Sequence, residues 1–262
     1  MSFVGKSPSE TFKDITYVNN NNSGVTTSVK ALKTGEGSDT ALSISDRALQ
    51  VKSQTNNATA FDVKNASGTS KLLVDTINDQ VKALGIHVNT QYAYFGVSSG
   101  IAAGFLVNTH HPLPFTGNNH TLALQNDFSL GTDTDPATSF TTADGASTDA
   151  SLIVPAIWLV PDNITIDAVY SLEGGDNATG GTTRMHLMSY TFTSGSTSAL
   201  TGGTLLAHNS DVVNAGSEQA YKSTWTVDSN RVDADKVILA TFLTSSVTGD
   251  YSSTVIVKYH LR

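Results

Sequence analysis

The sequence predicts an all-β protein in which a trimeric stalk of short strands precedes an antiparallel β-sandwich of jelly-roll type. The first observation is the composition, because the 262 residues include 30 Ser and 35 Thr but only four Glu. Such a chain is poor in strong helix formers and rich in strand and turn formers. The other two observations are short alternating segments in residues 40–90 and long ones in residues 91–262. No segment has the pattern of a helix of three turns.

The long alternating segments lie in residues 91–262, which we expect to form the sandwich head. Turn-forming Gly, Asn, Asp and Pro separate these segments. About eight antiparallel strands over this length favour two packed sheets. Trp158 and Trp225 fall inside the alternating patterns, and we expect them in the core rather than on a platform for stacking sugars. The expected strands cover residues 121–126, 151–160, 163–173, 184–193, 204–208, 219–227, 236–245 and 251–261.

Residues 40–90 form a ladder of short strands, each with two apolar side chains that point the same way. These side chains are too few to offset the conformational entropy lost on folding, and the ladder has no second apolar layer of its own. We therefore expect three copies of the chain to wind around one axis with these side chains inside. The alternative is a small meander packed on the head. The expected trimer core is Leu42, Ile44, Leu49, Val51, Phe61, Val63, Leu72, Val74 and Val81.

Residues 1–39 are expected to form a docking segment that becomes ordered on a partner. The stretch is polar, includes four consecutive Asn at residues 19–22, and has too few apolar residues for a core of its own. The alternative is a disordered leader. The residues expected to dock are Phe3, Val4, Phe12, Ile15 and Tyr17.

The charge is distributed unevenly between the two halves of the chain and argues against nucleic acid as a partner. The formal net charge is −8, and residues 101–262 hold six cations and fifteen anions against nine and eight in residues 1–100. Because cations are few and not clustered, we expect no binding to nucleic acid phosphates.

No apolar run approaches the roughly 18 residues of a membrane helix, and the start lacks a secretion signal, so we expect no membrane insertion. The absence of cysteine excludes disulfides and thiolate metal sites.

Sequence motifs of catalysis are missing, and we do not expect an enzyme. The chain has no nucleophile elbow, zinc-protease motif, Walker loop or dinucleotide fingerprint. A glycosidase would need two carboxylates that face one cleft. The even spacing of Asp167 and Glu173 would let them share a strand face, although exposed strand and turn positions are the simpler interpretation.

Two groups of residues have the chemistry to hold a cation, although no cofactor is predicted outright. Asp133 and Asp135 lie in an acidic loop and could offer oxygens to Ca²⁺, but the loop lacks the Gly and the closing Glu of an EF-hand. His110, His111 and His120 could offer imidazole nitrogens, and one His from each of three chains would form a three-nitrogen site on a three-fold axis. The alternative for these histidines is a loop role in which they cap backbone carbonyls.

The start of the chain, Phe-Val-Gly-Lys-Ser-Pro at residues 3–8, resembles the start of structural appendage proteins of marine tailed bacteriophages. The alternating segments at residues 41–44, 48–51 and 60–63 are similar to those of phage fibre stalks. The resemblance covers residues 1–85. It implies attachment to the particle through the N-terminal part, a trimeric stalk, and a C-terminal β-domain displayed outward.

These observations predict a structural protein of the virion surface. We expect a homotrimeric short fibre or decoration protein with three parts, residues 1–39, 40–90 and 91–262. Its expected partners are two further copies of the chain and a major capsid protein or a tail protein, with the capsid preferred because the ladder is too short for a long fibre. The alternative is a receptor-binding or glycan-binding, lectin-like head, and a third hypothesis is a depolymerase.

Overall fold

The protein, seen in a computed structural model, divides into two compact units, Met1–Val88 and Asn89–Arg262. The structure describes residues 16–21, 23–97, 106–115, 129–142, 149–175, 179–246 and 251–262. Within these ranges almost every element is a strand and the one α-helix is four residues long, so the all-β prediction is confirmed. No helix in the described ranges is long and apolar enough to span a membrane.

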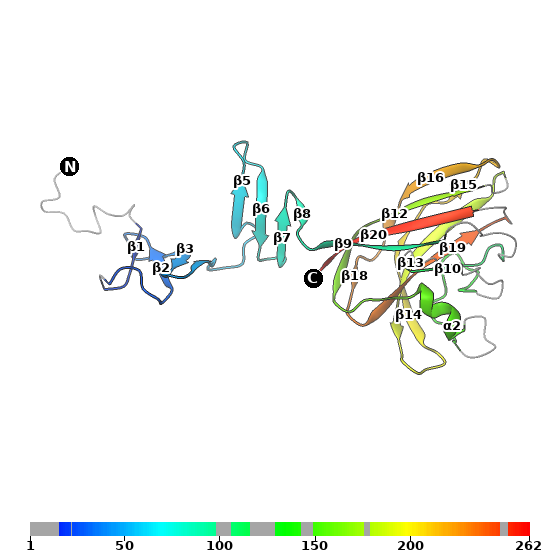
Figure 1. Ribbon diagram of the computed structural model, residues 1–262, viewed down its shortest axis with the longest axis horizontal. Helices are drawn as coiled ribbons and strands as arrows, with labels where there is room; N and C mark the ends of the chain where they lie inside the picture. Colours follow the sequence, from blue (N-terminus) through cyan, green and yellow to red (C-terminus); the bar gives the residue numbers. More distant parts are fainter. Residues whose placement is uncertain are drawn as a thin grey trace, which may run out of the picture. The chain divides into compact units, whose positions relative to one another are not determined.

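The first unit contains two four-stranded antiparallel meanders (Figure 1). Gly37 and Gly68 sit in tight turns with φ angles of 87° and 83°, which residues with a side chain rarely adopt. One meander consists of β1 (Tyr17–Val18), β2 (Lys30–Lys33), β3 (Asp39–Ile44) and β4 (Leu49–Val51). The other consists of β5 (Phe61–Lys64), β6 (Ser70–Asp75), β7 (Gln80–Ala83) and β8 (Ile86–His87). Part of the segment expected to dock therefore pairs with the first ladder strand through β2, while Phe3, Val4, Phe12 and Ile15 lie outside the described residues.

The apolar residues expected in the trimer core share one face of each meander. Phe61 lies opposite Val74, which lies opposite Val81, and Ile44 lies opposite Leu49. The strands pair within one chain, so sister chains are not needed to satisfy the backbone. The side chains remain on the surface, however: no apolar side chain of the described part of this unit is buried, and Leu49 is 68% exposed.

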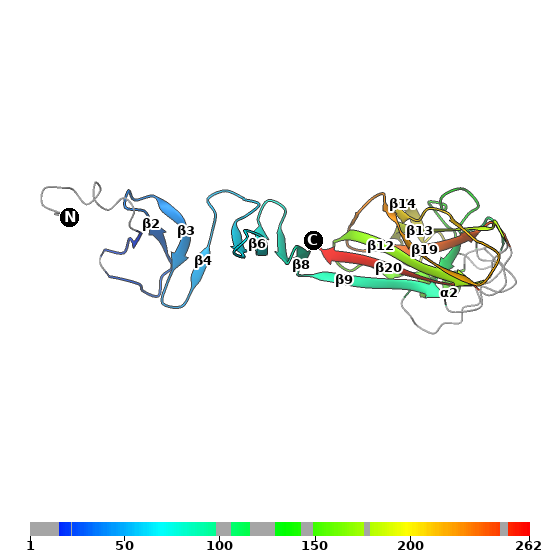
Figure 2. The same cartoon turned by 90° about the horizontal axis from the view of Figure 1, so that it is seen from above.

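The second unit is a sandwich of two antiparallel sheets. The front sheet has the order β16 (Gln219–Thr224), β12 (Ile164–Gly175), β20 (Tyr251–Leu261) and β9 (Thr90–Val97), with β18 (Arg231–Val232) also paired to β12. The back sheet has the order β10 (His111–Leu113), β19 (Lys236–Thr244), β13 (Thr182–Phe192), β14 (Leu200–His208) and β17 (Thr226–Val227). Two short strands, β11 (Trp158–Leu159) and β15 (Val212–Val213), pair with β19 and β13. Figure 2 shows β9, β20 and β12 side by side in the front sheet.

The connections between these strands are those of a jelly roll. Along the chain the eight main strands are β9, β10, β12, β13, β14, β16, β19 and β20. Numbered one to eight, they are ordered 1-8-3-6 in the front sheet and 2-7-4-5 in the back sheet. Every connection except that between β13 and β14 crosses from one sheet to the other, which is the double Greek-key winding of a jelly roll. The predicted jelly-roll sandwich is confirmed.

The side chains of β13 alternate between two apolar cores. Met185 and Leu187 point between the sheets, into a core that contains both tryptophans. Met188 and Tyr190 point to the outer face of the back sheet, where a second core forms. Leu130, Phe140 and Ile153 close this second core from outside. We call the described residues 129–142 and 149–157, from which these three side chains come, the covering segment.

The expected strand at residues 151–160 is wrong for most of its length. Ala150–Ile153 form the helix α2 and Val154–Ala156 a 3₁₀ turn, so only β11 is extended. The Asp149 carbonyl accepts the N–H groups of Leu152 and Ile153, both at 3.0 Å, and Pro155 has no N–H to give to a sheet. The expected strand at residues 121–126 lies outside the described residues.

The two tryptophans occupy the core as predicted. Trp158 and Trp225 are 7% and 5% exposed, and the Trp225 indole N–H donates to the Ser171 hydroxyl at 2.9 Å. Both residues belong to the sandwich, so tryptophan fluorescence reports on this unit alone.

Candidate functional site

Two histidines from the predicted cation group hold a loop in place at the start of β10. His110 and His111 are fully buried. His110 Nε2 lies 3.0 Å from the Asp133 carbonyl oxygen, and His111 Nε2 lies 3.2 Å from the Leu106 carbonyl oxygen. Both side chains therefore cap backbone carbonyls, which was the alternative interpretation. His120 lies outside the described residues.

The two aspartates that could offer oxygens to Ca²⁺, Asp133 and Asp135, belong to no group of three or more possible metal ligands among the described residues. Asp135 instead contacts a histidine that the sequence did not single out, since its Oδ1 lies 3.4 Å from His186 Nε2. The contact that Asp135 makes is therefore with the sheet beneath the acidic loop.

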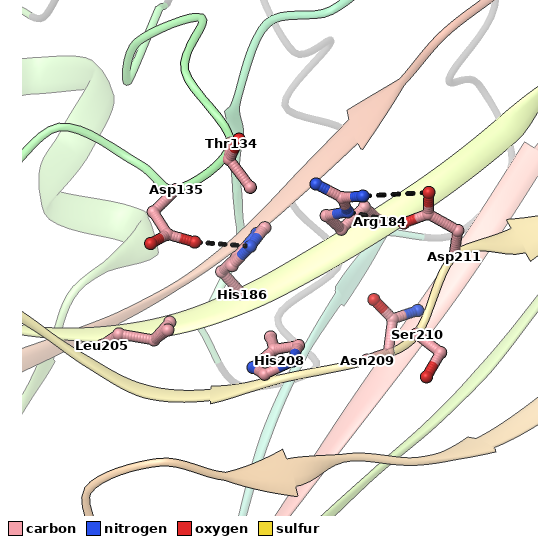
Figure 3. Close-up of a pocket in the computed structure, with 9 residues that line it drawn as sticks. All are labelled: Thr134, Asp135, Arg184, His186, Leu205, His208, Asn209, Ser210 and Asp211. Atoms are coloured by element: carbon pink, nitrogen blue, oxygen red, sulfur yellow. Dashed lines mark hydrogen bonds and ion pairs between the residues drawn. The ribbon is translucent and has the colours of Figure 1, made fainter.

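A polar pocket opens on the outer face of the back sheet, beside the second core (Figure 3). Its volume is about 450 Å³. Strand β13 supplies Arg184 and His186 because Met185, between them, points into the sandwich. The end of β14 supplies His208 and the residues that follow it, and the covering segment supplies Asp135. The pocket thus depends on three segments that are far apart in sequence.

The floor of the pocket is an imidazole that stays neutral. His186 is 1% exposed, and its Nδ1 has no hydrogen-bond partner among the described residues. Burial lowers the pKa of His186 to about 3, and the neighbouring His110, Arg184 and His208 act in the same direction. The His186 ring centroid lies 4.9 Å from that of His110 and 6.2 Å from that of His208. Nε2 faces Asp135 Oδ1 at 3.4 Å, and the Nδ1 atom is buried.

A forked ion pair forms one wall of the pocket. Arg184 Nε and Nη2 donate to the two carboxylate oxygens of Asp211 at 2.5 and 2.9 Å. This contact raises the pKa of the Arg184 guanidinium, chiefly through the hydrogen bond to Asp211. The two-point geometry fixes the plane of the guanidinium and leaves Nη1 pointing away from Asp211 (Figure 3).

A buried carboxyl group lies behind this pocket, inside the sandwich. Glu173 is 3% exposed; its Oε2 accepts from Thr183 Oγ1 at 2.5 Å and from the Tyr251 hydroxyl at 2.9 Å. Asn209, which also lines the pocket, approaches Glu173 Oε1 to 3.5 Å. Burial raises the pKa of Glu173 despite the two hydrogen bonds, which act against that rise. Glu173 is thus a structural group that favours its neutral form.

A Glu173→Gln variant should gain stability relative to the wild type as the pH rises. The folded pKa of Glu173 lies above the ordinary value of 4.5, so the stabilising contribution is complete below pH 4.5 and is lost as the pH rises through the folded pKa. Glutamine keeps the acceptor for Thr183 and Tyr251 without this loss. Urea unfolding followed by tryptophan fluorescence measures the difference. The control is Glu218→Gln at an exposed position, and a pH-independent difference for Glu173→Gln would contradict the prediction.

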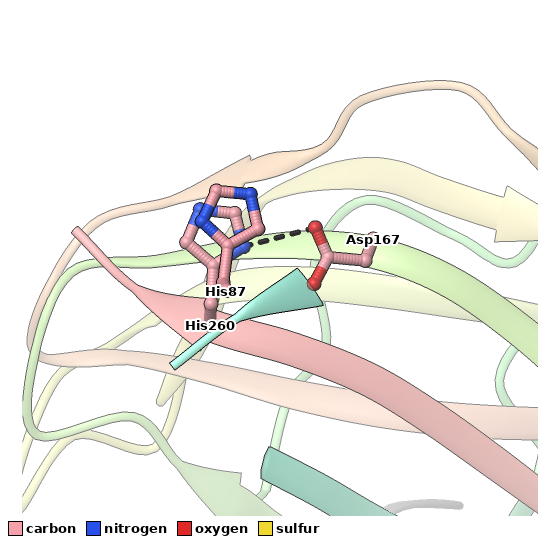
Figure 4. A group of neighbouring side chains, drawn as sticks. All are labelled: His87, Asp167 and His260. Carbon is pink, nitrogen blue, oxygen red and sulfur yellow. Dashed lines mark hydrogen bonds and ion pairs between the residues drawn. The ribbon is translucent and has the colours of Figure 1, made fainter. Parts of the chain in front are cut away.

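Asp167 and Glu173 do not share a strand face, contrary to their even spacing. The pairing of β12 with β20 shifts register between Ile166 and Ala168, and this bulge reverses the alternation. Asp167 therefore points outward, and its Oδ1 lies 2.9 Å from His260 Nδ1 (Figure 4). The two carboxyl groups cannot act on one substrate.

Sequence reasoning missed His186, Arg184, His208 and Asp211 as a group. In the sequence each of them is an ordinary strand or turn residue, because no local pattern shows which outer sheet face another segment of the chain will cover. The available signal was polar residues at alternate positions of the strand 184–193, where an apolar core was expected on one side only.

No protein-family model matches the sequence, and no curated protein matches it.

Proposed function

We propose that the protein is a structural component of a tailed-phage virion, a homotrimeric short fibre or decoration protein that carries its jelly roll outward. The observation that carries this proposal is the apolar face of the ladder. Seven of its nine expected core residues are at least 37% exposed in the single chain, and Ile44 and Val74 are only half-buried.

An apolar sheet face that is exposed in the single chain favours association with another chain. In the meander of β5 to β8, the cross-strand row Phe61, Val74 and Val81 lies next to the row Val63, Leu72 and Ala83. Contiguous apolar rows on a sheet favour association when no segment of the same chain covers them. A second copy offers the same rows in the same order, and three copies around an axis bury all of them without an open edge.

Light scattering on the full chain tests the assembly. The expected mass is three times 27.5 kDa at micromolar concentration. A Leu72→Asp variant should fall to the mass of one chain, because three carboxylates would meet at the axis. Lys71→Asp is the matched control, since the adjacent side chain points to the other face of β6 and should leave the mass unchanged. A wild-type protein that is monomeric would refute the assembly.

The virion role has a separate test. Particles of the phage that encodes the chain should lose small projections when the gene is deleted, and electron microscopy of both particles shows whether the loss is on the capsid or the tail. We expect the capsid. Particles that are indistinguishable with and without the chain would refute the virion role, whatever the oligomeric state.

A further inference from the structure

We propose that the polar pocket on the outer face of the back sheet binds a neutral saccharide. Two hollows adjoin there, of about 450 and about 310 Å³. Thr134, Arg184 and Asp211 line both of them, so the ion pair stands between two adjacent compartments. Each volume lies within the range of small-ligand sites, and together they suit one or two sugar rings.

The wall between the compartments is preorganised. Asp211 holds Arg184 by two hydrogen bonds, which leaves Nη1 of Arg184 as a fixed donor. Asp211 carries lone pairs beyond those used by Arg184 and remains an acceptor. The orientation of Asn209, which lies beside Asp211 in the lining, is fixed as well, because its Oδ1 accepts from the Met185 N–H at 2.7 Å. A donor and an acceptor at fixed separation match the adjacent hydroxyl groups of a sugar, each of which both donates and accepts.

One histidine adds an acceptor to the same space. His208 Nδ1 lies 2.8 Å from Asp228 Oδ2, and when this nitrogen donates to the carboxylate, Nε2 of the neutral ring is an acceptor. His186 beneath it is 1% exposed and its Nδ1 is buried, so this ring offers the ligand packing surface rather than a hydrogen bond. A ligand rich in hydroxyl groups supplies a donor to His208.

The lining disfavours the other classes of ligand. An anion would meet the carboxylates of Asp135 and Asp211, with the one arginine already neutralised by Asp211. A transition metal would need imidazole and carboxylate atoms around one point, and these residues form no such group within the described ranges. Among the residues that line the larger hollow, Leu205 alone has an apolar side chain. A neutral polyhydroxyl compound is what remains.

Glycan-array screening of the full chain, followed by calorimetric titration of each neutral hit, tests this assignment. We expect binding to neutral glycans with dissociation constants at or below about 10 mM. Asp211→Asn and His208→Ala should each weaken binding roughly tenfold or more, because the first replaces a carboxylate oxygen acceptor by an N–H donor and the second removes the ring nitrogens. Melting temperatures establish that both variants fold, and His208 lies at the half-exposed rim, where a substitution is tolerated.

The matched control is Arg262→Lys. Arg262 also pairs with an aspartate, through a single contact with Asp233 Oδ1 at 2.7 Å away from the pocket, so this variant should bind as the wild type does. Three outcomes would overturn the proposal: no neutral glycan bound, only acidic glycans bound, or binding unchanged in both pocket variants. Loss of binding in EDTA would also overturn it, since it would show that a cation rather than direct hydrogen bonds holds the sugar. The oligomeric state does not enter the test, so the proposal stands or falls independently of the trimer.

Discussion

Acidification from pH 6.5 toward pH 3 should destabilise the jelly roll, and a His186→Gln variant should lose less stability over the same interval. The His186 ring is buried, and its pKa is about 3 in the folded protein against 6.5 for the free side chain. The folded state therefore keeps the ring neutral while the unfolded chain takes up a proton. The stabilisation is complete above pH 6.5 and is lost as the pH falls through that interval, at about 1.4 kcal/mol for each pH unit.

The measurement is the free energy of unfolding from urea titrations at several pH values, read by tryptophan fluorescence. The stability of His186→Gln relative to the wild type should rise steadily as the pH falls, whatever the difference at neutral pH. Gln219→Asn at an exposed position of the same unit is the control, because neither side chain titrates and the variant should follow the wild-type pH profile. Parallel pH profiles for wild type and His186→Gln would show that burial of this imidazole has no energetic consequence.

Removing the Tyr190 side chain should cost the jelly roll about 3–5 kcal/mol, the usual range for a large buried aromatic residue. Tyr190 of β13 is fully buried beneath the covering segment, and its ring lies 5.5 Å from that of Phe140. Its hydroxyl donates to the Ala137 carbonyl at 2.9 Å. Tyr190→Ala would leave a cavity at this contact and release the covering segment from the sheet.

Two further variants show how much of this cost comes from the hydrogen bond and how much from burial of the ring. Tyr190→Phe keeps the ring and loses only the hydrogen bond, so the cost should fall to about 1 kcal/mol. Phe192→Ala removes an aromatic side chain from the same strand at a position that is 39% exposed, and it should cost much less than Tyr190→Ala. Urea unfolding gives all three values, and limited proteolysis should cut within residues 129–142 in Tyr190→Ala alone. Equal costs for Tyr190→Ala and Phe192→Ala would mean that the second core adds no stability.

The covering segment also connects stability to the proposed binding site. It carries Asp135 to His186, so the pocket is complete only while Leu130 and Phe140 remain packed on the sheet. We expect Tyr190→Ala to weaken saccharide binding even though Tyr190 does not line the pocket.

The regular parts of the fold were predictable because a strand repeats every two residues. The strands at residues 236–244 and 251–261 begin and end close to the expected positions, and their alternation assigns side chains to the inside of the sandwich. The bulge at Asp167 was not predictable, since a one-residue register shift leaves no mark on composition or spacing. The helix α2 was missed because its apolar residues resemble those of a buried strand.

Local patterns were enough to predict the all-β class, the jelly-roll head and the apolar residues of the ladder, because alternation and turn-forming residues act over a few neighbouring positions. Three features became visible only in three dimensions: the ladder strands pair within one chain, residues 129–142 cover the back sheet, and four polar side chains meet in one pocket, namely Asp135, Arg184, His186 and His208. These features join residues that are far apart in the chain. Their contacts depend on which sheet faces remain open after the strands have paired, and no local pattern encodes that.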